Sequence, residues 1–114
     1  MTTFTCSYKI MADRDNNRLY MILKGFVMDE YVRRVVEKIR CEVHKLKAGF
    51  DVISDVSQLK AATMDDARRI LTAQQQAVRK GARRVISVAK PFEFCTSKNI
   101  ESIVVDSIEQ AENV

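Results

Sequence analysis

Asp55 and Ser57 are the two residues of this 114-residue sequence whose types and spacing come closest to a catalytic arrangement. A serine beside a carboxylate becomes a nucleophile only when a general base accepts its proton. His44 is the only histidine, and no pattern in the sequence places it near Ser57. We therefore predict that the chain is not an enzyme. We interpret Asp55 and Ser57 as part of a hydrogen-bonded turn, which both residue types commonly stabilise.

The sequence shows no pattern typical of a metal or cofactor site. Cys6, Cys41 and Cys95 match no CxxC or zinc-ligand spacing. We interpret them as reduced thiols with a structural or incidental role, and redox sensing is the alternative. Asp65 and Asp66 are adjacent in a predicted helix and therefore point to different sides of it. No glycine-rich phosphate-binding motif occurs, so we predict neither a metal nor a cofactor.

Composition indicates one compact domain spanning residues 1–114. The chain is 46% hydrophobic and 30% charged, with one proline and three glycines, which is unlike disordered or low-complexity sequences. No apolar stretch approaches the roughly 18 residues needed to cross a bilayer. Residues 1–10 lack the basic, apolar and small-residue segments of a secretion signal. These observations predict a cytoplasmic protein with no membrane span.

The net charge of +4 and the pI near 9.1 raise the possibility of nucleic-acid binding. Lysines and arginines gather on the polar sides of two predicted helices, but Glu30, Glu37 and Glu42 interrupt the first group. Aromatic residues are not interleaved with the basic ones, as binders of single strands require. A solvated helical surface is therefore favoured over a nucleic-acid site.

Strands and helices alternate along the chain and must position the residues named above. Alternating and β-branched residues predict strands, and apolar residues spaced by three and four predict helices. The predicted strands cover 4–11, 19–23, 50–56, 85–89 and 103–105, and the predicted helices cover 29–47, 64–78 and 107–111. Thr63 is placed to be the N-cap of the second helix, which should start near Met64.

This pattern predicts an α/β fold with a mixed, mostly parallel sheet, an N-terminal β-hairpin and crossover helices. The element order is ββαβαβ, followed by a short strand and a short helix. Parallel sheets usually bind ligands beyond the carboxyl ends of their strands. In this chain that rim would be built from 26–28, 55–63 and 90–94.

Four segments spread over most of the chain carry a resemblance to the STAS domain, and more narrowly to the small SpoIIAA-like bacterial proteins. They are RLYMILKGF from Arg18, KAGFDVISDVSQL from Lys47, VRKGARRVISVAKP from Val78 and VVDSIEQA from Val104. The anti-sigma factor antagonists of this family carry a serine at the start of the second helix, and a partner kinase phosphorylates it. The resemblance therefore implies a regulatory module that works through a charge switch.

The antagonists carry a pair of serines at this helix start, and the matching positions here are Met64 and Asp65. The phosphorylatable serine that the resemblance implies is therefore missing. Asp65 offers a permanent negative charge, and Thr63 is a hydroxyl one position earlier. Both residues are also ordinary for a helix N-terminus, so capping is favoured over phosphorylation. A protein partner is expected to bind near Asp55, Ser57 and this helix start.

An alternative function is a carrier of a small apolar, lipid-like ligand. Phe26, Met28, Phe92 and Phe94 would converge on the predicted rim and could line such a site. We favour an interpretation without a ligand, in which these side chains close the core or contact a second copy of the chain in a homodimer.

Overall fold

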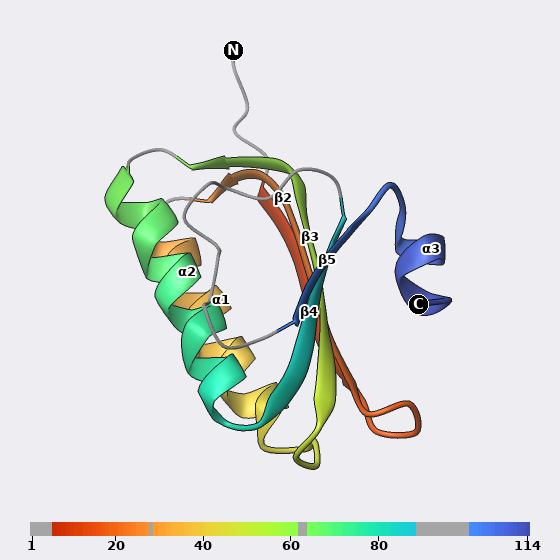
Figure 1. Ribbon diagram of the computed structural model, residues 1–114. Coiled ribbons are helices and arrows are strands. Elements are labelled where there is room, and N and C mark those ends of the chain that lie inside the picture. The colour runs from red at the N-terminus through yellow and green to blue at the C-terminus, as the bar shows by residue number, and fades with distance from the viewer. Residues whose placement is uncertain (1–5, 28, 62–63, 89–100) are drawn as a thin grey trace.

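The computed structural model describes residues 6–27, 29–61, 64–88 and 101–114, and Figure 1 shows how they are arranged. Within these ranges the chain forms five strands and three helices in the predicted order. They are β1 (Cys6–Asp13), β2 (Arg18–Val27), α1 (Asp29–Val43), β3 (Phe50–Ala61), α2 (Met64–Arg79), β4 (Ala82–Val88), β5 (Glu101–Val105) and α3 (Ile108–Glu112). The predicted α/β fold is thus confirmed.

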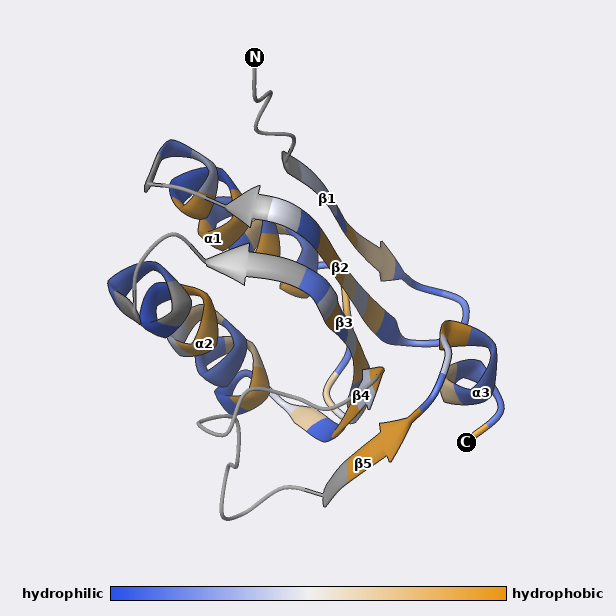
Figure 2. Cartoon of the chain, turned by 90° about the horizontal axis from the view of Figure 1, so that it is seen from above, coloured by the Kyte–Doolittle hydropathy of each residue, from blue (hydrophilic) through white to orange (hydrophobic). Residues whose placement is uncertain are grey.

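One sheet forms the middle layer, with its strands in the order β1-β2-β3-β4-β5. β1 and β2 form the predicted antiparallel hairpin, and β2, β3, β4 and β5 run parallel to one another. Helices α1 and α2 cover one face of the sheet, whereas α3 lies on the other (Figures 1 and 2). We call these the α1–α2 face and the α3 face.

The larger apolar cluster lies between the sheet and helices α1 and α2. The predicted stripe of α1 is confirmed, because Val32, Val35, Ile39 and Val43 are all buried there. Helix α2 and the strands supply the remaining buried residues, which are Ile10, Leu19, Met21, Leu23, Phe50, Val52, Ile70, Ala73, Ala77 and Val85. Burial of this much apolar surface is the main force that holds both helices on the sheet.

A smaller apolar cluster lies on the α3 face. Ala111 of α3 packs there against four buried residues of the sheet, Tyr20, Ile53, Ile86 and Val88. The predicted capping pattern starts this helix, since the Gln110 N–H donates to Ser107 Oγ at 3.2 Å. Gln110 Oε1 in turn accepts from the Asp106 N–H at 2.8 Å. A helix of five residues covers only part of the α3 face.

β3 is longer than the sequence indicates. It was predicted to end at Val56 and continues to Ala61, because its pairing with β2 resumes beyond a register shift. Ile22 pairs with Asp55 and Lys24 pairs with Gln58, so β3 has one residue more than β2 between the two pairs. An extra residue of this kind is a β-bulge.

β1 is an edge strand, and one of its outward N–H groups is covered by a side chain from α1. The N–H of Ala12 donates to Glu42 Oε1 at 3.3 Å, and Lys45 forms an ion pair with the same carboxylate. The hydrogen bond from Lys45 is the largest cause that holds the pKa of Glu42 below its usual range, and the Ala12 bond acts in the same direction. A buried carboxylate thus satisfies part of the sheet edge.

The connections before β3 and before β4 meet through two glycines. The Gly49 N–H donates to the Gly81 carbonyl at 2.6 Å. Gly81 has a φ of +130°, and a Cβ there would lie 3.2 Å from Ala48 Cα. Both the backbone conformation and the close approach therefore require glycine at Gly81.

We expect Gly81→Ala to lower the free energy of unfolding by about 1 kcal/mol or more, because strain at φ > 0 adds to the contact with Ala48. Gly49→Ala is the matched control, since Gly49 also has a positive φ but a Cβ added to it would meet no atom within 4 Å. Urea unfolding of both variants measures the difference. An equal loss at the two glycines would show that the contact with Ala48 has no effect.

Candidate functional site

Asp55 and Ser57 form a hydrogen-bonded pair at the bulge in β3. Asp55 Oδ1 accepts from the Ser57 N–H at 3.1 Å and from the Ser57 hydroxyl at 2.6 Å. These are the hydrogen bonds that residues of this type were expected to make, but they lie within a strand and not in a turn. The bulge leaves backbone groups without ladder partners, and the Asp55 carboxylate satisfies one of them.

His44 does not lie near Ser57, so it cannot act as its general base. His44 follows α1 and precedes the first residue of β3, Phe50, whereas Ser57 lies seven residues into that strand. Seven strand residues span about 23 Å. Within the described residues, no group of three or more histidine, cysteine, aspartate or glutamate side chains is arranged to hold a metal ion.

Helix α2 starts at Met64, as predicted, and carries two acidic residues in its first turn. Asp65 is exposed, whereas Asp66 is buried and lies 3.9 Å from Arg69. Carboxylates at this end of a helix are stabilised by its dipole. Further along the helix, Ser54 Oγ donates to Gln74 Oε1 at 3.3 Å and ties α2 to β3. The helix is therefore held against the sheet while Asp65 faces solvent.

β3 connects the two parts of the predicted site. Ile53 belongs to the apolar cluster of the α3 face, so alternation places Asp55 on that face as well. α2 covers the opposite face, and β3 continues for four residues after Ser57 before it ends at Ala61. Ser57 thus lies about 13 Å along the strand from its carboxyl end.

Several predicted residues cannot be placed. Thr63, Met28, Phe92 and Phe94 lie outside the described residues. Phe26 is within β2, where its backbone is opposite Lys60. The apolar-ligand site is therefore neither supported nor tested by the described part of the chain.

The structure also reveals an open area of the α3 face that was not predicted. β1 and β2 contribute Lys9, Met11 and Ile22, and α3 closes one side of the area with Ile108. These residues enclose part of a hollow of about 420 Å³. The alternation of polar and apolar residues in β1 was visible in the sequence. The sequence did not predict that α3 leaves part of this face uncovered, because the pattern of a five-residue helix does not indicate which strands the helix packs on.

None of the helices in the described residues has the length and apolar character needed to cross a membrane.

Comparison with known proteins identifies the fold. No family model matches the sequence, and no curated protein matches it either. Among solved structures, it is similar to an uncharacterized DUF3478-family protein with a SpoIIAA-like fold from Shewanella loihica PV-4. The TM-score is 0.69 at 14% identity, over 99% of this chain and 97% of that chain.

A second similar structure is the anti-sigma factor antagonist SpoIIAA in its unphosphorylated form. The TM-score is 0.65 at 12% identity, and the match covers 94% of this chain and 96% of that chain. The identities are too low to carry residue roles across, but both alignments run almost end to end. The fold of this chain is therefore SpoIIAA-like, as its resemblance to the STAS domain predicted.

Proposed function

We propose that this chain is a non-enzymatic regulatory module that binds a protein partner. The residues that we assign to partner binding are Asp55 and Ser57 on the α3 face of β3, and Thr63, Met64 and Asp65 at the start of α2. We call these two groups together the β3–α2 surface. The observation that carries the proposal is the exposed Asp65 at the start of α2, in a fold shared with an anti-sigma factor antagonist. A fold alone does not fix a function, so the proposal depends on this surface.

The chemistry of the β3–α2 surface suits recognition by a partner with basic side chains. Ser57 fixes the orientation of the Asp55 carboxylate through two hydrogen bonds, which reduces the entropy lost when a partner binds. Asp65 supplies a permanent negative charge, so recognition at this helix start does not depend on a phosphate. Because Ser57 lies about 13 Å before the end of β3, a partner that contacts both groups must follow the strand to the start of α2. An interface of typical size covers about 800 Å² on each partner, which sets the scale of such a contact.

We expect Asp65→Lys to weaken partner binding about tenfold or more, because it replaces an attraction with a repulsion at the start of α2. Tagged wild-type protein would first recover the partner from a lysate of the native host. Affinity would then be measured with the purified pair. Asp15→Lys is the matched control, since Asp15 is exposed in the turn of the β1–β2 hairpin and the charge change is the same.

Two outcomes would contradict this proposal. One is that every recovered protein binds the Asp65→Lys variant as tightly as the wild type. The other is that Asp15→Lys reduces binding by the same factor, which would show that only the net charge matters. Phosphorylation of Thr63 by a recovered kinase would instead support a charge switch at the same helix start.

A further inference from the structure

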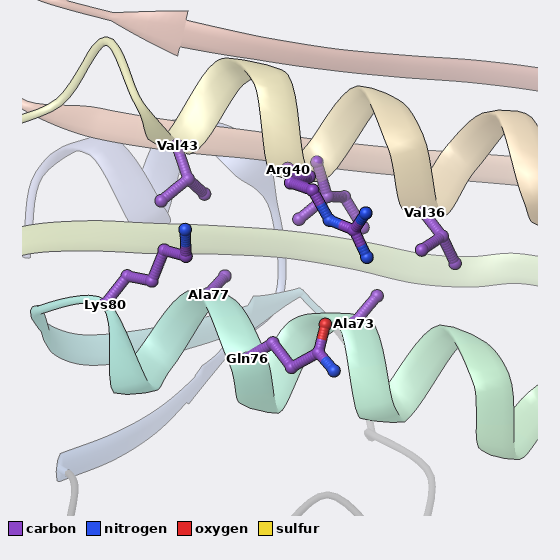
Figure 3. Close-up of a pocket in the computed structure, with 8 residues that line it drawn as sticks. Val36, Arg40, Val43, Ala73, Gln76, Ala77 and Lys80 are labelled. Atoms are coloured by element: carbon purple, nitrogen blue, oxygen red, sulfur yellow. The ribbon is translucent and has the colours of Figure 1, made fainter.

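Helices α1 and α2 enclose a groove on the outer surface, away from the sheet. Two adjoining hollows make up the groove, and the larger has a volume of about 310 Å³. Its floor is apolar, with Val36 on α1 and Ala73 and Ala77 on α2. Ala73 and Ala77 are buried against the core, and their short side chains set how closely α2 approaches α1 at the bottom of the groove (Figure 3).

The rim of the groove is strongly basic. It carries Arg33 and Arg40 from α1, Arg69 from α2 and Lys80 directly after α2, and Glu37 is the one carboxylate among the described lining residues. Arg69 is also ion-paired with Asp66, so Arg33, Arg40 and Lys80 supply most of the charge open to a ligand. Arg40 is 3.8 Å from Glu37, but both side chains are more than half exposed, so this ion pair stabilises little. Figure 3 shows Arg40, Gln76 and Lys80 at the gap between the two helices.

Spacing along the two helices gives the groove a definite length. The four α1 residues of the larger hollow, Arg33, Val36, Glu37 and Arg40, follow the i, i+3, i+4, i+7 pattern of one helical stripe. On the other side the lining extends from Arg69 of α2 to Lys80 directly after it, a distance of eleven residue steps or about 16 Å. Basic groups thus lie along about three helical turns, above an apolar floor.

We propose that this basic groove binds an acidic amphipathic helix of a partner protein. Apolar side chains of that helix would lie on the floor, and its carboxylates would pair with the arginines and lysine of the rim. Nucleic acid fits less well, because its phosphate backbone carries no apolar side chains to lie on the floor of the groove. The described lining residues also include no aromatic side chain on which a base could stack. Asp65 lies one turn before Arg69 on α2, so different variants separate the two proposals: Asp65 is not a lining residue of either hollow, and Arg33 and Lys80 do not belong to the β3–α2 surface.

The test uses a fluorescein-labelled helical peptide with glutamates flanking a leucine stripe, titrated with the full chain by fluorescence anisotropy. We expect Arg33→Glu combined with Lys80→Glu to weaken binding at least tenfold. The control combines Arg14→Glu with Arg79→Glu, which changes the net charge equally at exposed sites outside the groove, and should weaken binding less than threefold. Arg33→Gln with Lys80→Gln should give an intermediate loss.

The same measurements can overturn the proposal in four ways. The wild type does not bind the peptide, or it binds a scrambled peptide of identical composition equally well. The two charge-reversed variants lose affinity by the same factor. A labelled single-stranded oligonucleotide binds more tightly than the peptide and depends on the groove residues, which would assign the groove to nucleic acid. Circular dichroism of each variant verifies that it is folded.

Discussion

Replacing Asp51 with alanine is expected to lower the free energy of unfolding by about 3 kcal/mol, the largest single effect that we predict. Asp51 is buried at the start of β3 and faces two arginines of β4. Its carboxylate accepts two hydrogen bonds from Arg84, both at 3.1 Å, and two from Arg83, both at 3.3 Å. Without Asp51, the nearly buried Arg84 loses two hydrogen bonds and one ion pair.

The loss would also affect α3. Arg84 donates to the backbone carbonyl of Val114 at 2.9 Å, and Arg18 donates to that of Glu112 at the same distance. Cations near the carboxyl end of a helix are favourable, and here they hold α3 on the sheet. Asp51 fixes one of these arginines in place, so its removal should loosen the covering of the smaller apolar cluster.

Arg83→Ala is the control for this prediction. The Arg83 side chain is 62% exposed, against 14% for Arg84, so its ion pair with Asp51 should contribute less than about 1 kcal/mol. Urea unfolding at neutral pH measures both variants. A loss below about 1 kcal/mol for Asp51→Ala would mean that water replaces the carboxylate at little cost, and the prediction would be wrong.

The second large effect concerns Glu42 and depends on pH. We expect Glu42→Ala to lower the free energy of unfolding by about 2 kcal/mol at pH 7, because the Ala12 N–H loses a charged acceptor and Lys45 loses its partner. The pKa of Glu42 is lowered in the folded chain from an ordinary value of 4.5. A lowered pKa means that this contribution is fully present above pH 4.5 and disappears as the pH falls through the folded-state value.

The difference between wild type and Glu42→Ala should therefore shrink between pH 7 and about pH 3. Urea unfolding at both pH values measures it. Glu37→Ala is the control, since Glu37 lies on the same helix but is mostly exposed, and its removal should have little effect at either pH. A stability difference for Glu42→Ala that does not change with pH would contradict an ionised Glu42 as its source.

The parts of the fold that follow from local pattern were predictable. The apolar stripe of α1 required burial on one side, and Ser107 with Gln110 marked the start of α3. The full extent of β3 was not predictable, because residues after Val56 are held in the strand by pairing with β2 across a bulge. Such pairing depends on residues more than thirty positions away, so no local signal reports it.

The candidate site, like the fold, has a part that local sequence predicted and a part that it did not. Residue type predicted that Asp55 and Ser57 form hydrogen bonds, although in a turn and not in the strand where they lie. Capping predicted that α2 starts near Met64. The basic groove was missed, although its arginines and lysine stand out in the sequence as charges on two separate helices. Its existence depends on how closely α1 approaches α2, which is set by Ala73 and Ala77 in the folded chain.

The order of the strands in the sheet has a consequence for how the chain reaches its native state. Each strand pairs with the strand that precedes it in the sequence, from β1 to β5. Only the β1–β2 pair is closed by a short turn, whereas the three parallel pairs join residues 17 to 34 positions apart. Long loops must therefore close before these three pairs can form, which slows folding relative to a fold rich in local contacts. The hairpin is the one pair of the described strands that does not wait for such a closure.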